Sequence, residues 1–203
     1  MVDKLRIKLR HLPARLPDGF DANRQAWGMC EFYILDSTGG RESLLTVEWH
    51  VAHAVRWFIN EFYPVAWGIY PEQQTDENTA QAINRIRALR REEFISEKRY
   101  AQLQQFNMSH NLTYAFPSVP MPHIYLAYTG NGEISHSPSF STMKSHTGSV
   151  EFKTGEWSYH FDMDDFLDNS LHHIKEFLEE WDRSGESDVP NVLHSDLNQI
   201  FED

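Results

Sequence analysis

The first residues of the chain alternate between apolar and basic side chains, which is typical of a half-buried strand. Leu5, Ile7 and Leu9 alternate with Lys and Arg over residues 4–10, so one face of this strand is apolar and the other is basic. Residues 28–36 are more continuously apolar and end at a Ser-Thr-Gly-Gly turn signal. The pattern therefore predicts two strands in this part of the chain.

Apolar side chains recur every three to four residues in the segments that follow, and this spacing predicts helices. We expect the first helix over residues 47–62 and the second over residues 76–93. The last and longest is predicted over residues 163–183, where an apolar stripe runs up to a glycine that ends the helix. The expected N-caps of the first helix, of a third helical segment and of the last helix are Thr46, Ser96 and Asp162.

Two hairpins are predicted before the last helix, because the apolar period there changes to two. The first joins residues 123–128 to 133–137 through Gly-Asn-Gly, which tolerates the positive φ of a tight turn. The second joins residues 149–153 to 156–161 through Thr-Gly. The Ser/Thr-rich residues 135–149 between the two hairpins are expected to form a mobile loop.

Hairpins without alternating βαβ units favour an α+β fold, with an antiparallel sheet built largely from hairpins and about four helices packed on it. We expect a single α+β domain over residues 1–185 and an acidic C-terminal tail over residues 186–203. A chain of 203 residues buries enough surface to be stable without disulfides. Its one cysteine, Cys30, excludes an internal disulfide and is expected to be a buried structural thiol.

The composition excludes several classes of protein. With 40% hydrophobic and 13% aromatic residues, the chain is too apolar to be disordered. It has no apolar run of about 18 residues, so we expect no transmembrane helix and no association with a membrane. The first ten residues lack the hydrophobic stretch of a signal peptide. Together with the single cysteine, this favours a cytoplasmic protein.

The negative charge of the chain is concentrated near its C-terminus. The formal net charge is −12, and residues 1–100 carry 14 Lys or Arg and 14 Asp or Glu. Residues 162–203 carry 13 Asp or Glu and only 2 Lys or Arg. A balanced body with an acidic end indicates a basic protein partner. It disfavours nucleic-acid binding, since phosphate contacts require clustered Lys and Arg.

This charge distribution favours a non-catalytic interaction protein, either an immunity-type inhibitor or a regulatory subunit. Such a protein would cover a basic partner with its acidic C-terminal helix and tail, because complementary charge accelerates association and sets specificity. The sequence contains no specific catalytic signature and no motif for a cofactor, and it leaves the oligomeric state open. The residues expected to contact the partner are Glu176, Glu179, Glu180 and Asp182.

Two histidines suggest an alternative function, that of a small metal-dependent hydrolase. On the first predicted helix, His50 and His53 are three residues apart, so both imidazoles would lie on one side of the helix beside Trp57. A zinc site needs at least three protein ligands, and a third would come from a distant segment, such as His110 or His123. The simpler interpretation is that the two histidines and the tryptophan line a pocket or an interface.

A longer pattern spans residues 109–181. It comprises Ser-His-Asn-Leu at 109–112, Phe-Pro-Ser-Val-Pro at 116–120, a glycine-turn hairpin, Val-Glu-Phe at 150–152 and an amphipathic helix that follows Phe166. This order resembles a C-terminal module of uncharacterised bacterial proteins. The resemblance implies an α+β module from a bacterial cytoplasm, and it carries no activity to transfer.

Overall fold

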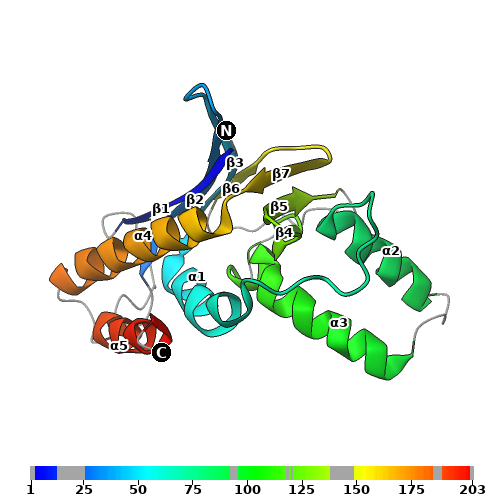
Figure 1. The fold of residues 1–203 in the computed structure, drawn as a ribbon. Coiled ribbons are helices and arrows are strands. Elements are labelled where there is room, and N and C mark those ends of the chain that lie inside the picture. Colours follow the sequence, from blue (N-terminus) through cyan, green and yellow to red (C-terminus); the bar gives the residue numbers. More distant parts are fainter. Residues whose placement is uncertain are drawn as a thin grey trace.

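Two antiparallel sheets form the framework of the protein in the computed structural model (Figure 1). The first sheet has the strand order β1-β2-β3-β6 and the second β4-β5-β7. The strands are β1 Lys4–His11, β2 Trp27–Leu35, β3 Arg41–His50, β4 Ile124–Tyr128, β5 Gly132–His136, β6 Ser149–Phe152 and β7 Trp157–Phe161. The structure describes residues 3–12, 26–91, 96–117, 119, 121–137, 149–184 and 189–201.

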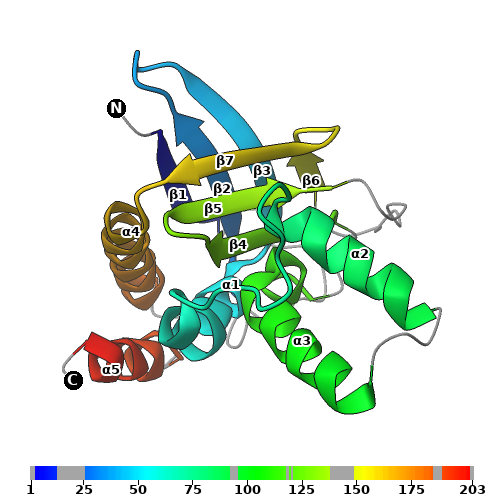
Figure 2. The ribbon, with the colours of Figure 1, turned by 45° about the vertical axis from the view of Figure 1, so that its right-hand side comes forward.

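The described residues form five α-helices, of which α1 to α4 contact the sheets and α5 packs on α4 and η2. This confirms the α+β prediction. Helices α2 and α3 lie beside the second sheet, whereas α4 lies along β1 with α5 next to it (Figure 2). The α-helices are α1 Val51–Trp57, α2 Thr79–Arg91, α3 Glu97–His110, α4 Met163–Arg183 and α5 Val189–Phe201. Three short helical segments complete the fold: the π-helix η2 Phe58–Phe62, the 3-10 helix η3 Tyr63–Val65 and the 3-10 helix η4 Leu112–Tyr114.

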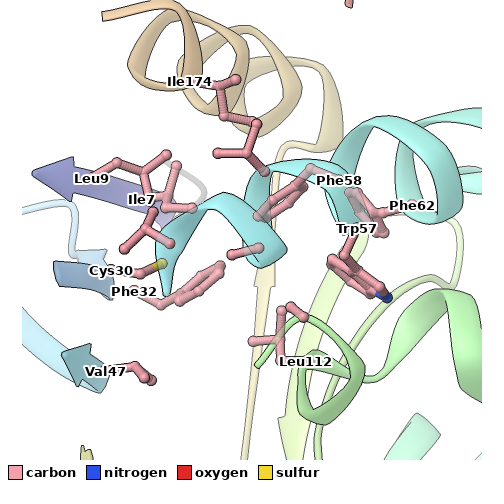
Figure 3. Close-up of a cluster of buried hydrophobic side chains, with 14 of the residues drawn as sticks. Ile7, Leu9, Cys30, Phe32, Val47, Trp57, Phe58, Phe62, Leu112 and Ile174 are labelled. Carbon is pink, nitrogen blue, oxygen red and sulfur yellow. The ribbon is translucent and has the colours of Figure 1, made fainter. Parts of the chain in front are cut away.

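A shared hydrophobic core joins the first sheet to α1, η2 and α4. Ile7 and Cys30 from the sheet, Phe58 from η2 and Ile174 from α4 gather in this core and are at most 1% exposed (Figure 3). The alternation predicted for β1 is confirmed, since its apolar residues are the buried ones. Burial raises the pKa of the Cys30 thiol well above its usual value, as expected for a structural cysteine.

The helix predicted over residues 47–62 is wrong in its first part. Residues up to His50 belong to β3, in which Val47 lies opposite Cys30 of β2, and the helix begins only at Val51. Val47 and Val51 are four residues apart, so they fit one face of a helix as well as the inner face of a strand followed by a turn of helix. Pairing with β2 decides in favour of the strand, so Thr46 is not an N-cap.

The first predicted hairpin is confirmed. The second is wrong, because its two strands do not pair with each other. Strands β4 and β5 pair around Gly130, whose φ of 94° requires a glycine-like conformation. Strands β6 and β7 both form, but β6 pairs with β3 and β7 pairs with β5. The turn at Gly155 therefore carries the chain from one sheet to the other. Most of the loop predicted over residues 135–149 lies outside the described residues.

The predicted boundaries of α4 and the start of α3 are confirmed. The side chain of Asp162 accepts a hydrogen bond from the backbone N–H of Asp165 at the start of α4, and Ser96 does the same for Arg99 in α3. Part of the segment predicted as a tail is helix α5. It packs against α4 and buries its own leucines.

We predict that Ile7→Ala will destabilise the protein by about 2–5 kcal/mol, because it removes fully buried apolar atoms and leaves a cavity beneath α4. The measurement is the free energy of unfolding in urea. The control is Lys8→Ala on the opposite face of β1, for which we expect a loss below about 1 kcal/mol. Equal losses for the two variants would contradict the assignment of the faces of β1.

Candidate functional site

The acidic residues near the C-terminal end of α4 lie on its solvent-exposed side. Glu176, Glu179, Glu180 and Asp182 are all exposed. The structure therefore brings the four residues predicted to contact a partner onto one exposed face, which we call the acidic face.

The opposite side of α4 explains why this face points outward. Phe177, Leu178 and Trp181 are at most 1% exposed and alternate along the helix with the acidic residues. Because buried residues three and four apart cover one side of a helix, the remaining positions must face the solvent. Helix α4 packs on β1 with one side and contacts α5, so the acidic face is held on a fixed helix.

Most carboxylates of the acidic face have no ion-pair partner in the described part of the chain. Glu176 is the exception, with its oxygens 3.3 Å from Nε2 of His172 and 2.9 Å from Nδ1 of His173. The nearby Arg183 donates from Nε to the backbone carbonyl of Glu179, at 3.1 Å, and not to a carboxylate. The side chains without a partner among the described residues are Glu179, Glu180 and Asp182.

Asp165, at the start of α4, has a different role. Asp165 accepts two hydrogen bonds from the guanidinium of Arg6, at 2.6 and 3.1 Å, and lies 3.6 Å from Nζ of Lys4. The hydrogen bond from Arg6 lowers the pKa of Asp165. Asp165 therefore ties this end of α4 to β1, whereas no comparable ion pair with a sheet involves Glu179, Glu180 or Asp182 in the described residues.

His50 and His53 lie together, although they belong to different elements. His50 is the last residue of β3 and His53 lies in α1, with ring centroids 5.8 Å apart. Burial lowers the pKa of His50 to about 4 and also lowers the pKa of His53, so both imidazoles are neutral at pH 7. Trp57 is only 4% exposed and donates from Nε1 to the backbone carbonyl of Met108, at 3.0 Å. Trp57 thus links α1 to α3 within the core.

The two histidines lack a third metal ligand in the described residues, where no group of three or more His, Cys, Asp or Glu side chains is placed to hold a metal ion. The distant histidines considered from the sequence make other contacts. Both ring nitrogens of His110 lie near backbone carbonyls, 3.0 Å from Phe106 and 3.1 Å from Val65. Nδ1 of His123 lies 2.9 Å from the amide nitrogen of Asn111. His50 and His53 are therefore two potential ligands, one fewer than the three protein ligands of a zinc site.

A buried polar network connects α3 to β4, and the sequence patterns did not indicate it. His110 stacks on Phe106 with ring centroids 3.8 Å apart and is 1% exposed. Asn111 is completely buried and hydrogen bonds to Asn107 and Thr113 as well as His123. Hydrophobic periodicity cannot reveal such residues, because they are polar at buried positions.

A cavity of about 920 Å³ opens beside α2 and was likewise not predicted. It lies between residues 69–78, the start of α2, the β4–β5 turn and β7. Glu133 of β5 lines it and is only 1% exposed. The carboxylate accepts a hydrogen bond from the backbone N–H of Thr79 at 2.8 Å, and so it also holds the N-terminus of α2 against the second sheet.

Comparisons with protein families, with curated proteins and with solved structures found no match to this chain. The resemblance of residues 109–181 to a bacterial module therefore stays a prediction. None of the described helices combines the length and the apolar character needed to cross a membrane.

We predict that His110 makes the protein sensitive to acid. Burial lowers the pKa of His110 to about 4, below the value of about 6.5 for an unfolded chain, so the unfolded state binds the proton more tightly. The contribution of neutral His110 to the free energy of unfolding is fully present above pH 6.5, and it is lost as the pH falls toward 4. The expected loss between pH 7.5 and pH 5 is about 2 kcal/mol.

The measurement is the free energy of unfolding in urea at pH 7.5 and pH 5 for the wild type and for His110→Gln. The variant is expected to be less stable at pH 7.5 but to lose about 2 kcal/mol less than the wild type on acidification. The same loss in both proteins would show that His110 does not carry this pH dependence.

Proposed function

We propose that the protein is a non-catalytic interaction protein, an immunity-type inhibitor or a regulatory subunit, which binds a basic protein partner through the acidic face of α4 and the C-terminal tail. The observation that carries this proposal is the set of exposed carboxylates without ion-pair partners in the described residues, Glu179, Glu180 and Asp182. They are held on a helix whose other side is buried.

The spacing of these residues favours a partner that brings positive charge. Glu176 is three residues from Glu179 and four from Glu180, so carboxylates one turn apart repel one another. Lys or Arg side chains of a partner would relieve this repulsion. The attraction would act mainly on the rate of association and would weaken with salt.

We propose that part of the tail contributes to the same surface. Helix α5 packs against α4, so a partner that covers the acidic face would also meet α5. The charge of this region repels phosphates, which is consistent with a protein partner and not with nucleic acid.

Several features support a binding role over a catalytic one. His50 and His53 have no third metal ligand in the described residues, and Cys30 is buried with a raised pKa, so its thiol is a poor nucleophile. The proposed setting is a bacterial cytoplasm. It rests on the resemblance described above and on a single cysteine that is not in a disulfide.

The test uses the double variant Glu179→Lys/Glu180→Lys and a matched control, Glu97→Lys/Glu151→Lys. All four residues are exposed, and both variants change the net charge equally. Basic proteins that the wild type retains at low salt and releases at high salt are identified, and their binding is then measured with purified components by biolayer interferometry.

We expect the α4 variant to bind at least about tenfold more weakly, mostly through a slower association rate, and the control to change by less than about twofold. Equal binding by the two variants would show that the acidic face is not the surface that binds the partner. Failure of the wild type to retain any basic protein in a salt-sensitive way would reject the proposed function.

A further inference from the structure

The cavity beside α2 has the size of a small-ligand site. Its volume of about 920 Å³ lies within the range of roughly 300–1,000 Å³ that is usual for such sites. Its residues belong to the β4–β5 turn, β5, β7, the start of α2 and the segment before it. None of them is part of the acidic face, so the cavity is a separate feature of the molecule.

Glu133 gives the cavity a buried negative charge. One carboxylate oxygen, Oε1, accepts the hydrogen bond from the backbone N–H of Thr79, and no hydrogen bond or ion pair with a described residue involves Oε2. A buried carboxylate is costly unless a positive charge balances it. The one N–H donor from α2 orients the carboxylate but does not neutralise it.

The arginines near the cavity are paired with other carboxylates. The guanidinium of Arg85 donates to the carboxylate of Glu77 at 2.6 and 3.1 Å, and Arg99 donates to Glu72. Lys and Arg are absent from the described residues that line the cavity, whereas Asp76 and Glu77 add two further acidic side chains. The basic side chain among these lining residues is that of His160, which is exposed and lies opposite Glu133 in the β5–β7 register. The cavity therefore lacks a Lys or Arg counterion for Glu133, and no ion pair joins His160 to Glu133 in the described structure.

The walls of the cavity also offer apolar surface. Ile69 is 61% exposed although it is a large apolar residue, and it lines the cavity with Pro71 and the buried Tyr70. An alkyl chain that packs on Ile69 would remove this surface from water. Apolar walls beside a buried carboxylate suit a ligand with a positively charged head and an aliphatic stem.

We propose that this cavity binds an organic cation, a guanidinium or primary ammonium group on an alkyl chain, with Glu133 as its counterion. The same chemistry is found in free amines and in the Arg or Lys side chains of another protein. This proposal does not depend on the acidic face, and the test below separates the two sources.

The experiment is isothermal titration calorimetry of the full chain with defined probes. Agmatine and spermidine represent free amines, and N-acetyl-arginine methylamide and N-acetyl-lysine methylamide represent protein side chains. The capped citrulline derivative is the neutral isostere of the arginine probe. We expect saturable binding of at least one cationic probe and at least about tenfold weaker binding of the citrulline compound, because a hydrogen bond to a charged group contributes more than a neutral one.

The key variant is Glu133→Gln, which keeps a carbonyl oxygen for the N–H of Thr79 and replaces the other carboxylate oxygen with a neutral NH2 group. We expect it to weaken binding of the cation by at least about tenfold. The matched control is Glu151→Gln, which removes the same charge from an exposed residue of β6 that does not line the cavity. Its binding is expected to stay within about twofold of the wild type.

A second variant keeps the proposal testable if Glu133→Gln fails to fold. Ser158 is exposed and lines the cavity, so Ser158→Arg adds a tethered guanidinium there and is expected to abolish binding of the probes. Stronger binding of agmatine or spermidine would assign a free amine, and stronger binding of the capped amino acids would assign a protein side chain. The absence of saturable binding, equal binding of the citrulline compound or unchanged binding by Glu133→Gln or Ser158→Arg would overturn the proposal.

Discussion

The packing of α4 along β1 is the contact on which the rest of the arrangement depends. Strand β1 lies at the edge of the first sheet, and an edge strand exposes backbone groups that could pair with another chain. The side chain of Asn169 in α4 accepts a hydrogen bond from the backbone N–H of Ile7 at 3.2 Å, and Arg6 holds Asp165 beside it. The helix therefore covers the edge with polar contacts while its apolar residues extend the core.

This packing also determines where the charge of the protein lies. Because Phe177 and Trp181 must face the core, Glu179 and Glu180 have no position other than the solvent side. Acidic residues on one helix thus divide into two groups. Asp165 pairs with Arg6 of the same chain, which lowers the pKa of Asp165. Glu179, Glu180 and Asp182 have no ion-pair partner among the described residues, so their carboxylates can contact another molecule. The net charge alone would not have separated these groups.

The sequence correctly predicted the elements that depend on contacts between neighbouring residues. Its predictions were wrong where pairing with a distant strand determines the structure. Asp162 as the N-cap of α4 and the β4–β5 hairpin were predictable because each signal lies within a few residues. Val47 fits a helix or a strand equally well until β2 pairs with it, and β6 pairs with β3 about a hundred residues away in the chain. The same limit applies to function. The acidic face follows from the apolar period of one helix, whereas Glu133 is recognisable only when β5 meets α2.

The carboxylates of the acidic face and the carboxylate of Glu133 differ in the affinity that a bound cation could gain from them. Charges on the exposed end of α4 are surrounded by water and ions, and an exposed ion pair contributes at most about 1 kcal/mol. The acidic face is therefore suited to attracting and orienting a partner, and most of the affinity would have to come from apolar contacts. Glu133 is almost completely buried, and at the lower effective dielectric near a buried site the same attraction is several times larger. A cation in the cavity would thus gain affinity and would be less affected by salt, so salt dependence distinguishes the two sites physically.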